Sequence, residues 1–360
     1  MYLNVTEIES AITNLHDAHP GTTQIITPPH PTHEGRTTRL LRVGTRPVDE
    51  VPAILLLGGM HAREWVPPDA LISLAADLLE AHSLATGLGY GAAAFTAPQV
   101  TQVLDDLNLF FFPCVNPDGR AFSQTTSATW RKNRRPAPAG STGPSCVGVD
   151  LNRNFDFLWD HTAKFAPNAN VHTSDRPCDV QVYRGPAAAS EPETRNVVWA
   201  LDNHPQIEWL VDVHSAVPVI LHSWGCDQNQ SVTPADNFRN PDLDAVRGRP
   251  DDGIGEFIPE QDLQIGLELA EQMNDAVRAV RGVDYGVDAA YGLYPTSGTS
   301  DDYAYSRHLT DPAATKVFGF TIECGDTFQP DFGEAEQVIQ EVSAALVALA
   351  LKAPEVTHSV

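Results

Sequence analysis

Short, densely apolar runs constrain the fold of this chain more than any other feature. The candidate strands occupy residues 37–43, 51–57, 107–115, 207–213 and 316–322. Such runs are long enough for buried strands and too short for typical helices. Amphipathic stretches typical of helices alternate with them, at residues 4–16, 67–82, 192–204, 262–280 and 334–351. Strands that alternate with helices predict an α/β fold.

The length of 360 residues is sufficient to bury a complete core. We find no internal repeat and no linker between domains, so we expect residues 1–360 to form a single domain. Residues 125–191 are rich in Pro, Gly, Ser, Thr and Asn, which predicts a long and mostly irregular region. In a compact domain such a region is more often functional than idle. Residues 227–261 form a polar, acidic insertion without periodicity.

The formal net charge of -24 at pH 7 argues against binding to nucleic acid or to anionic membrane surfaces. It favours a cationic substrate, if the substrate is charged. The alternative is that the excess of Asp and Glu only solvates the surface. No stretch approaches the length of a membrane-spanning helix, and residues 1–4 do not open a basic region followed by an apolar one. We therefore expect no membrane insertion and no export signal in this chain.

The five cysteines are too few for a disulfide scaffold and include no Cys-x-x-Cys pair. Cys114 and Cys324 lie in or beside apolar runs, so we expect buried thiols there. Cys146 and Cys178 lie in loop-rich sequence, where they could pair with each other. Such a pair would indicate an oxidising compartment.

One candidate strand end presents groups that suit a metal. The run at 51–57 stops at Gly58 and Gly59, and His61 and Glu64 follow directly. The ends of strands are where open α/β sheets place their chemistry. Imidazole and carboxylate suit zinc, and catalytic zinc commonly takes three protein ligands and a water molecule. His-x-x-Glu spacing is also frequent by chance, so further ligands are required.

Two other strand ends supply such groups. The strand at 207–213 leads into His214, and the strand at 316–322 ends in Glu323. His214 would be the third metal ligand, and Glu323 would be free to act on metal-activated water. The alternatives are a buried histidine bonded to backbone and a carboxylate that serves as a cap or in a salt bridge. A carboxylate placed where an apolar strand stops favours function.

Several separate blocks of the sequence resemble the catalytic domain of zinc carboxypeptidases of the carboxypeptidase A and B type. The blocks are residues 59–65, 116–119, 130–132, 146–154, 213–215, 294–302 and 321–323, in the family order. The resemblance implies one domain with a mixed, mainly parallel central sheet flanked by helices, and a substrate-binding role for region 125–191. It also implies one Zn²⁺ per chain, a monomer, and peptide or protein C-termini as substrates. Cys146 and Cys178 match the family's disulfide positions, which suggests an extracellular protein.

The same resemblance assigns catalytic roles. His61, Glu64 and His214 match the zinc ligands, which are the ligand types that carboxypeptidase A uses. Glu323 matches the general base, which takes a proton from water and returns it to the leaving amine. Arg131 matches the arginine that polarises the scissile carbonyl; alternatively, it is a surface residue. A surface position is what we expect for the other basic residues of this run, Lys132, Arg134 and Arg135.

The resemblance also implies substrate contacts. Asn152 and Arg153 match the pair that grips the terminal carboxylate of the substrate, a contact that reads both charge and position. Tyr294 matches the tyrosine that closes over the bound residue, and Arg63 an additional subsite arginine. Asp150 matches the carboxylate that orients the first zinc histidine through its other ring nitrogen.

Asp301 matches the family position whose side chain determines the specificity pocket. Carboxypeptidase A types have an apolar residue at this position, whereas B types have aspartate. A buried carboxylate there would favour substrates that end in Lys or Arg. The alternative is that Asp301 is a turn residue that faces solvent. Ala216 departs from the tyrosine of many digestive relatives, and the insertion 227–261 has no counterpart of that length in them.

Two other functions remain possible on this scaffold. One is an amidohydrolase that acts on acyl-amino acids or cell-wall peptides, and the other is a binding module without activity. The set of substrate-contacting residues favours ordinary peptide C-termini over the first. The intact base Glu323 and the intact set of metal ligands argue against the second.

Overall fold

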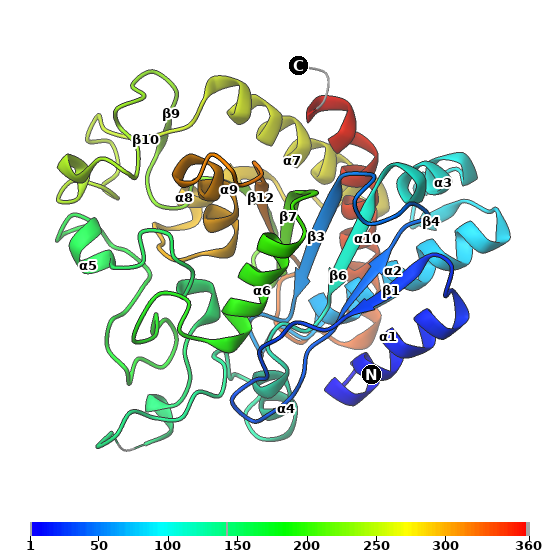
Figure 1. Cartoon of the computed structure of the whole chain (residues 1–360), viewed down its shortest axis with the longest axis horizontal. Coiled ribbons are helices and arrows are strands. Elements are labelled where there is room, and N and C mark those ends of the chain that lie inside the picture. Colours follow the sequence, from blue (N-terminus) through cyan, green and yellow to red (C-terminus); the bar gives the residue numbers. More distant parts are fainter. Residues whose placement is uncertain (1, 142, 358–360) are drawn as a thin grey trace.

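The computed structural model describes residues 2–141 and 143–357. A central sheet has the strand order β1-β2-β6-β3-β7-β12-β8-β11 (Figure 1). These strands are β1 (Thr23–Ile26), β2 (Leu40–Val43), β3 (Ala53–Gly58), β6 (Asn108–Phe112), β7 (Ile207–His214), β8 (Val219–His222), β11 (Val287–Ala289) and β12 (Phe318–Glu323). The pairs β6–β3, β3–β7, β7–β12 and β8–β11 are parallel, and the other three are antiparallel. The predicted mixed, mainly parallel α/β sheet is confirmed.

Helices cover both faces of the sheet because strand side chains alternate between two cores. On β3, Ile54 and Leu56 belong to the core that packs under α1, α2, α3, α7 and α10, whereas Leu55 and Leu57 belong to the core under α6 and α9. In Figure 1, α6 lies in front of the sheet, and α2 and α10 lie behind it. The helices are α1 (Val5–Ala18), α2 (Val66–Leu84), α3 (Ala97–Asp106), α4 (Pro117–Thr125), α5 (His161–Lys164), α6 (Pro192–Asn203), α7 (Glu260–Arg281), α8 (Ala290–Leu293), α9 (Ser300–Thr310) and α10 (Phe332–Thr357).

The strongly patterned elements lie where the sequence predicts them, with shifts of a few residues at their ends. The Asn-Pro-Asp-Gly sequence at 116–119, which is typical of a turn, forms the start of α4. The Asn116 side chain accepts a hydrogen bond from the Gly119 amide at 2.9 Å, as a helix N-cap does. Asn-Pro-Asp-Gly suits both a turn and a helix start, since proline is favoured at the first helical position. Among the described residues, no helix combines the length and apolar character that a membrane crossing requires.

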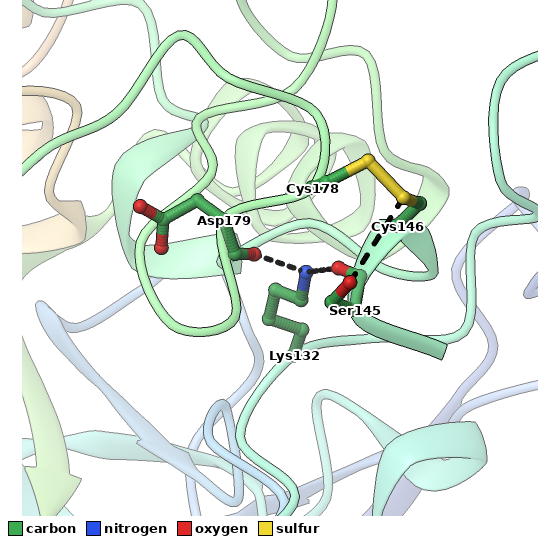
Figure 2. Close-up of a disulfide and its surroundings, with 5 residues drawn as sticks. All are labelled: Lys132, Ser145, Cys146, Cys178 and Asp179. Atoms are coloured by element: carbon green, nitrogen blue, oxygen red, sulfur yellow. Dashed lines mark hydrogen bonds between the residues drawn. A yellow bond between two sulfur atoms is a disulfide. The ribbon is translucent and has the colours of Figure 1, made fainter. Parts of the chain in front are cut away.

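The region between α4 and α6 contains little regular structure. Its described elements are η1 (Pro144–Cys146), η2 (Leu151–Arg153) and α5. The disulfide expected between Cys146 and Cys178 is present, and it joins the two sides of this region (Figure 2). Cys114 and Cys324 are buried free cysteines, as expected.

Lys132 lies beneath this disulfide, so its expected surface position is wrong. Its side chain is 1% exposed, and Nζ donates hydrogen bonds to the carbonyl oxygens of Ser145 at 3.0 Å and Asp179 at 2.6 Å (Figure 2). Burial lowers the pKa of Lys132 to about 8, although Asp179 opposes the shift. The ammonium group therefore holds together the two segments that the disulfide links.

Insertion 227–261 is held together by buried charges. A short parallel pair, β9 (Asn229–Gln230) and β10 (Glu256–Phe257), closes it. Arg247 is 1% exposed, and its Nε lies 3.5 Å from Oε2 of the equally buried Glu256. Asp227 Oδ2 accepts a hydrogen bond from the Gly248 amide at 2.8 Å. The insertion is thus an ordered part of the molecule, with a polar core of its own.

Candidate active site

The sheet brings three strand ends to one edge. β7 lies between β3 and β12, and all three are parallel, so their carboxyl ends meet. Gly58 pairs with Val213, and Glu323 pairs with His214. Gly59 turns the chain out of β3 with φ of +65°, where an added Cβ would meet the Pro68 ring at 2.9 Å. Glycine is therefore needed to deliver the segment that follows.

The structure brings His61, Glu64 and His214 to a common point. His61 Nδ1 lies 2.9 Å from Glu64 Oε1 and 2.9 Å from His214 Nδ1, and His214 Nδ1 lies 3.0 Å from Glu64 Oε2. All three side chains are buried, at 3% exposure or less. Two imidazole nitrogens and a carboxylate that converge in this way are the donor set of many catalytic zinc sites. These residues fit a bound zinc ion.

The electrostatics of these groups favour a cation at that point. Burial raises the pKa of Glu64, but the charges of His61 and His214 outweigh it and hold that pKa well below the usual range. Burial lowers the pKa of His214, but Asp212 and Glu64 outweigh it and raise that pKa well above the usual range. The carboxylate of Glu64 is therefore ionised, and His61 and His214 stabilise its negative charge.

Asp150 lies behind His61, where the sequence predicts it. Asp150 Oδ1 lies 3.1 Å from His61 Nε2, and Arg131 Nε donates to Oδ2 at 3.0 Å. Burial raises the pKa of Asp150, but Arg131 and His61 lower it well below its usual range. Arg131 is not a free surface residue, since its side chain is 10% exposed and lies 3.9 Å from Glu64. One carboxylate thus fixes both a candidate metal ligand and the arginine.

Glu323 lies beside the candidate metal ligands, but its pKa shifts in the opposite direction to that of Glu64. Burial, and next the charge of Glu64, raise the pKa of Glu323 to about 7, although His214 and Arg131 oppose the shift. Glu323 lines a pocket together with His61 and Arg131. A carboxyl group whose pKa is close to neutral can both accept and return a proton.

The same pocket collects most of the predicted substrate contacts. It is lined by His61, Arg131, Asn152, Arg153, Leu221, Ala290, Leu293, Tyr294, Thr296, Thr299, Asp301, Thr321 and Glu323. Arg63 does not line it; Arg63 donates to Gln181 Oε1 at 2.8 Å and stacks its guanidinium 4.2 Å from the centre of the Phe328 ring. The structure therefore brings together every predicted substrate contact except this outer arginine.

Arg153 is held in place by carbonyl groups. Its Nε donates to the His172 oxygen and its Nη1 to the Asn152 oxygen, each at 2.5 Å. Tyr294 stacks on His172 with ring centres 4.2 Å apart, and the Arg153 guanidinium lies 6.0 Å from the Tyr294 ring. A guanidinium fixed in this way presents its remaining N–H groups in a defined direction.

Asp301 lies at the start of α9 and is 3% exposed, so the alternative of a solvent-facing turn does not hold. Its Oδ2 accepts from Thr321 Oγ1 at 3.0 Å and its Oδ1 from the Asp302 amide at 2.8 Å. Each carboxylate oxygen has a second acceptor site, so both can receive a further donor from a guest. Asp301 therefore places an acidic group in the wall of the pocket.

Comparison with known proteins decides the family. A family model described as zinc carboxypeptidase matches residues 8–345. The chain belongs to the zinc carboxypeptidase family. The resemblance drawn from the sequence blocks is thereby confirmed, and zinc is the metal that the family implies.

Two carboxypeptidases resemble this chain in sequence, and one solved structure resembles it in fold. The chain is 30% identical over 296 residues to carboxypeptidase A2 of Rattus norvegicus, covering 82% of this chain and 55% of that protein. It is 30% identical over 297 residues to carboxypeptidase B of Astacus astacus, covering 82% and 77%. The chain therefore spans little more than half the length of the rat relative. The structure of bovine thrombin-activatable fibrinolysis inhibitor in complex with tick carboxypeptidase inhibitor shares the fold, with a TM-score of 0.73, 20% identity, and coverage of 100% and 99%.

Sequence reasoning missed one buried carboxylate next to a candidate ligand of this zinc carboxypeptidase. Asp212 Oδ2 lies 3.0 Å from His214 Nε2, and Asp212 is fully buried. Residues two apart on a strand point to the same face, so the Asp-x-His spacing at the end of β7 was the available signal. The pocket-lining residues Leu221 and Thr296 were also missed, because nothing in their local sequence marks them.

Proposed function

We propose that this protein is a zinc-dependent carboxypeptidase, with one zinc ion per chain, that hydrolyses the C-terminal peptide bond of peptides and proteins and prefers C-terminal Lys or Arg. The observation that carries the proposal is one pocket that borders the candidate metal ligands and is lined by a carboxyl group of near-neutral pKa, two arginines and an aspartate. These groups match the four tasks of such an enzyme. The tasks are proton transfer, stabilisation of the oxyanion, binding of the terminal carboxylate and selection of the side chain.

The terminal carboxylate of the substrate would be bound by Arg153 and Asn152. Arg153 is fixed by backbone carbonyls, so its free N–H groups can pair with both carboxylate oxygens. Asn152 Oδ1 accepts from the Ser300 amide at 2.8 Å, which leaves the Nδ2 group to donate. Tyr294, which lines the same pocket, would close over the bound residue. An enzyme that reads a free carboxylate cuts only at chain ends.

Bond cleavage would depend on Glu323 and Arg131. His61, Glu64 and His214 would hold a zinc ion, which would supply Lewis acidity toward the scissile carbonyl and would lower the pKa of water. Glu323 takes a proton from the attacking water as the new C–O bond forms, and returns it to the leaving amine as the C–N bond breaks. Arg131, held by Asp150, places a permanent positive charge beside the developing oxyanion.

Preference for a basic residue would come from Asp301. A lysine or arginine side chain in the pocket would pair with this buried carboxylate, whereas an apolar guest would leave the charge without a partner. We do not favour the alternative amidohydrolase, because the relatives are carboxypeptidases and the pocket contains the groups that read a peptide C-terminus.

A panel of blocked dipeptides ending in Lys, Arg, Phe, Leu or Glu tests the proposal, with the Asp301→Ala and Asp301→Asn variants alongside. We expect the parent to hydrolyse Lys and Arg substrates with kcat/KM at least about tenfold above the Phe substrate. Both variants should lose this preference while they retain bound zinc. A parent that prefers Phe, or variants with unchanged preferences, would contradict the assignment of Asp301. A zinc-loaded parent that cleaves none of these peptides would contradict the activity itself.

The proposed setting is extracellular and the proposed state is a monomer. The disulfide between Cys146 and Cys178 supports an oxidising compartment, where such bonds persist. Sedimentation of the purified protein tests the monomer, and localisation of a tagged chain in its source cells tests the compartment.

A further inference from the structure

We propose that Asp212 is a positioning residue for the metal centre, where it orients His214 as Asp150 orients His61. The inference rests on the proposed function, because it concerns the same three metal ligands. It makes this centre one in which a buried carboxylate stands behind each histidine.

The contacts around His214 support this role. Asp212 Oδ2 lies 3.0 Å from His214 Nε2, while His214 Nδ1 faces Glu64 and His61. The matching contact on the other ligand, from Asp150 Oδ1 to His61 Nε2, is 3.1 Å. A carboxylate can only accept, so Nε2 must carry the ring proton and Nδ1 presents its lone pair to the metal.

A competing contact shows why a carboxylate is needed at this position. The side-chain nitrogen Nδ2 of Asn152 lies 3.4 Å from the same His214 Nε2. If Nδ2 donated to Nε2, the ring proton would sit on Nδ1 and block the metal-binding lone pair. The contact of Asp212 with Nε2 is shorter, at 3.0 Å, and Asp212 is fully buried, so its contact prevails.

Asp212 is itself fixed by the helix that carries the specificity residue. Ser300, the first residue of α9, donates from Oγ to Asp212 Oδ2 at 2.6 Å and from its amide to Asn152 Oδ1 at 2.8 Å. The next residue is Asp301. Backbone pairing places Asp212 beside Thr321, which donates to Asp301. Asp212 therefore links the orientation of one metal ligand to the segment that binds the end of the substrate.

Zinc affinity of the Asp212→Asn variant, measured by competition with a chelator on the full chain, tests the proposal. We expect affinity to fall about 10–100-fold, and a similar fall for Asp150→Asn. The matched control is Asp302→Asn, which replaces a fully buried carboxyl group that accepts from the Gly225 amide; it should keep the parent's affinity. Asp212→Ser, which removes the charge with a smaller side chain, gives a second measurement if Asp212→Asn does not fold.

Two readouts separate positioning from a purely structural role. After Co²⁺ replaces zinc, the visible absorption bands of Asp212→Asn should differ from those of the parent, whereas those of Asp302→Asn should not. Added zinc should also raise the urea midpoint of Asp212→Asn less than that of the parent. Zinc affinity and Co²⁺ bands identical to the parent's would overturn the proposal for Asp212 alone. A parent chain that binds no zinc would instead overturn the proposed function.

Discussion

Glu64, which is buried, and Glu323, which is partly buried, have opposite pKa shifts because their neighbouring charges differ. Glu64 lies between two histidines, which hold its pKa below the usual range. Desolvation raises the pKa of Glu323 to about 7, and the charge of Glu64 is the next largest cause of the shift. Such separation is consistent with the proposed roles, in which one carboxylate binds a cation and the other transfers protons.

The first prediction concerns Glu323→Gln. We expect kcat to fall roughly 10²–10⁴-fold, because the amide cannot accept the proton of the attacking water. Zinc content, measured by atomic absorption, should not change, since Glu323 is not among the candidate ligands. Glu336→Gln, an exposed change on α10, is the matched control and should behave as the parent. Loss of zinc from Glu323→Gln would count against its role as a base.

The second prediction concerns Arg153→Lys, which keeps the charge but loses the planar fork. The guanidinium donates to two backbone carbonyls and still has N–H groups for the substrate, which a lysine cannot reproduce. We expect kcat/KM to fall roughly 10–100-fold, mainly through KM, as for loss of a charge-assisted hydrogen bond. The exposed Arg195→Lys on α6 is the control. An unchanged KM would show that Arg153 does not bind the terminal carboxylate.

At the scale of elements, α6 is joined to the N-terminal segment and to the loop after Lys132 through buried polar groups. Glu193 is fully buried on α6, and its Oε2 accepts from Asn133 Nδ2 at 3.0 Å. Asn133 also donates to Glu191, which contacts His33 at 2.8 Å and Arg135 at 2.8 Å. Burial raises the pKa of Glu193 to about 7, and the charge of Glu191 adds to the shift.

The third prediction follows from that shift. A carboxyl group whose pKa is higher in the folded state stabilises the fold at low pH, and this stability is lost as the pH rises through about 7. We expect Glu193→Gln to remove this loss, so the variant should unfold with a free energy about 1–3 kcal/mol above the parent's at pH 8. Urea unfolding of both proteins at pH 5 and pH 8 measures it. The pKa of His33 is raised chiefly by its hydrogen bond to Glu191, which both proteins keep, and to a smaller extent by the charge of Glu193. Parallel pH profiles for parent and variant would therefore refute the shift of Glu193.

At the scale of the whole molecule, the candidate metal ligands lie at or just beyond the ends of strands that the two cores hold in place. The fourth prediction is that a chelator abolishes activity, that added Zn²⁺ restores it, and that the far-ultraviolet circular dichroism does not change. Zinc at about 1,000 times its Kd should add about 4 kcal/mol to the free energy of unfolding. Denaturant unfolding with and without zinc measures this value. Collapse of the secondary structure on chelation would contradict a metal-independent fold.

Elements with a strong hydrophobic pattern could be predicted from the sequence, whereas elements without such a pattern could not. β3, β7 and β12 are almost entirely buried and stood out as apolar runs, whereas β8 and β11 are short and partly exposed. α9 was missed because polar residues fill its buried face. Lys132 was misplaced because the carbonyls that it contacts come from segments distant in the sequence. Local patterns cannot report partners that only the tertiary fold supplies.

The two halves of the site rest on different supports. The candidate metal ligands lie at or just beyond the ends of strands of the sheet. Asn152 and Arg153 instead lie in η2, within the mostly irregular region that the Cys146–Cys178 disulfide links. Reduction of the Cys146–Cys178 disulfide should therefore weaken binding of the peptide terminus while the candidate metal ligands and Glu323 stay in position on the sheet. Mild reductant should then blunt discrimination between free and amidated peptide ends before it slows turnover.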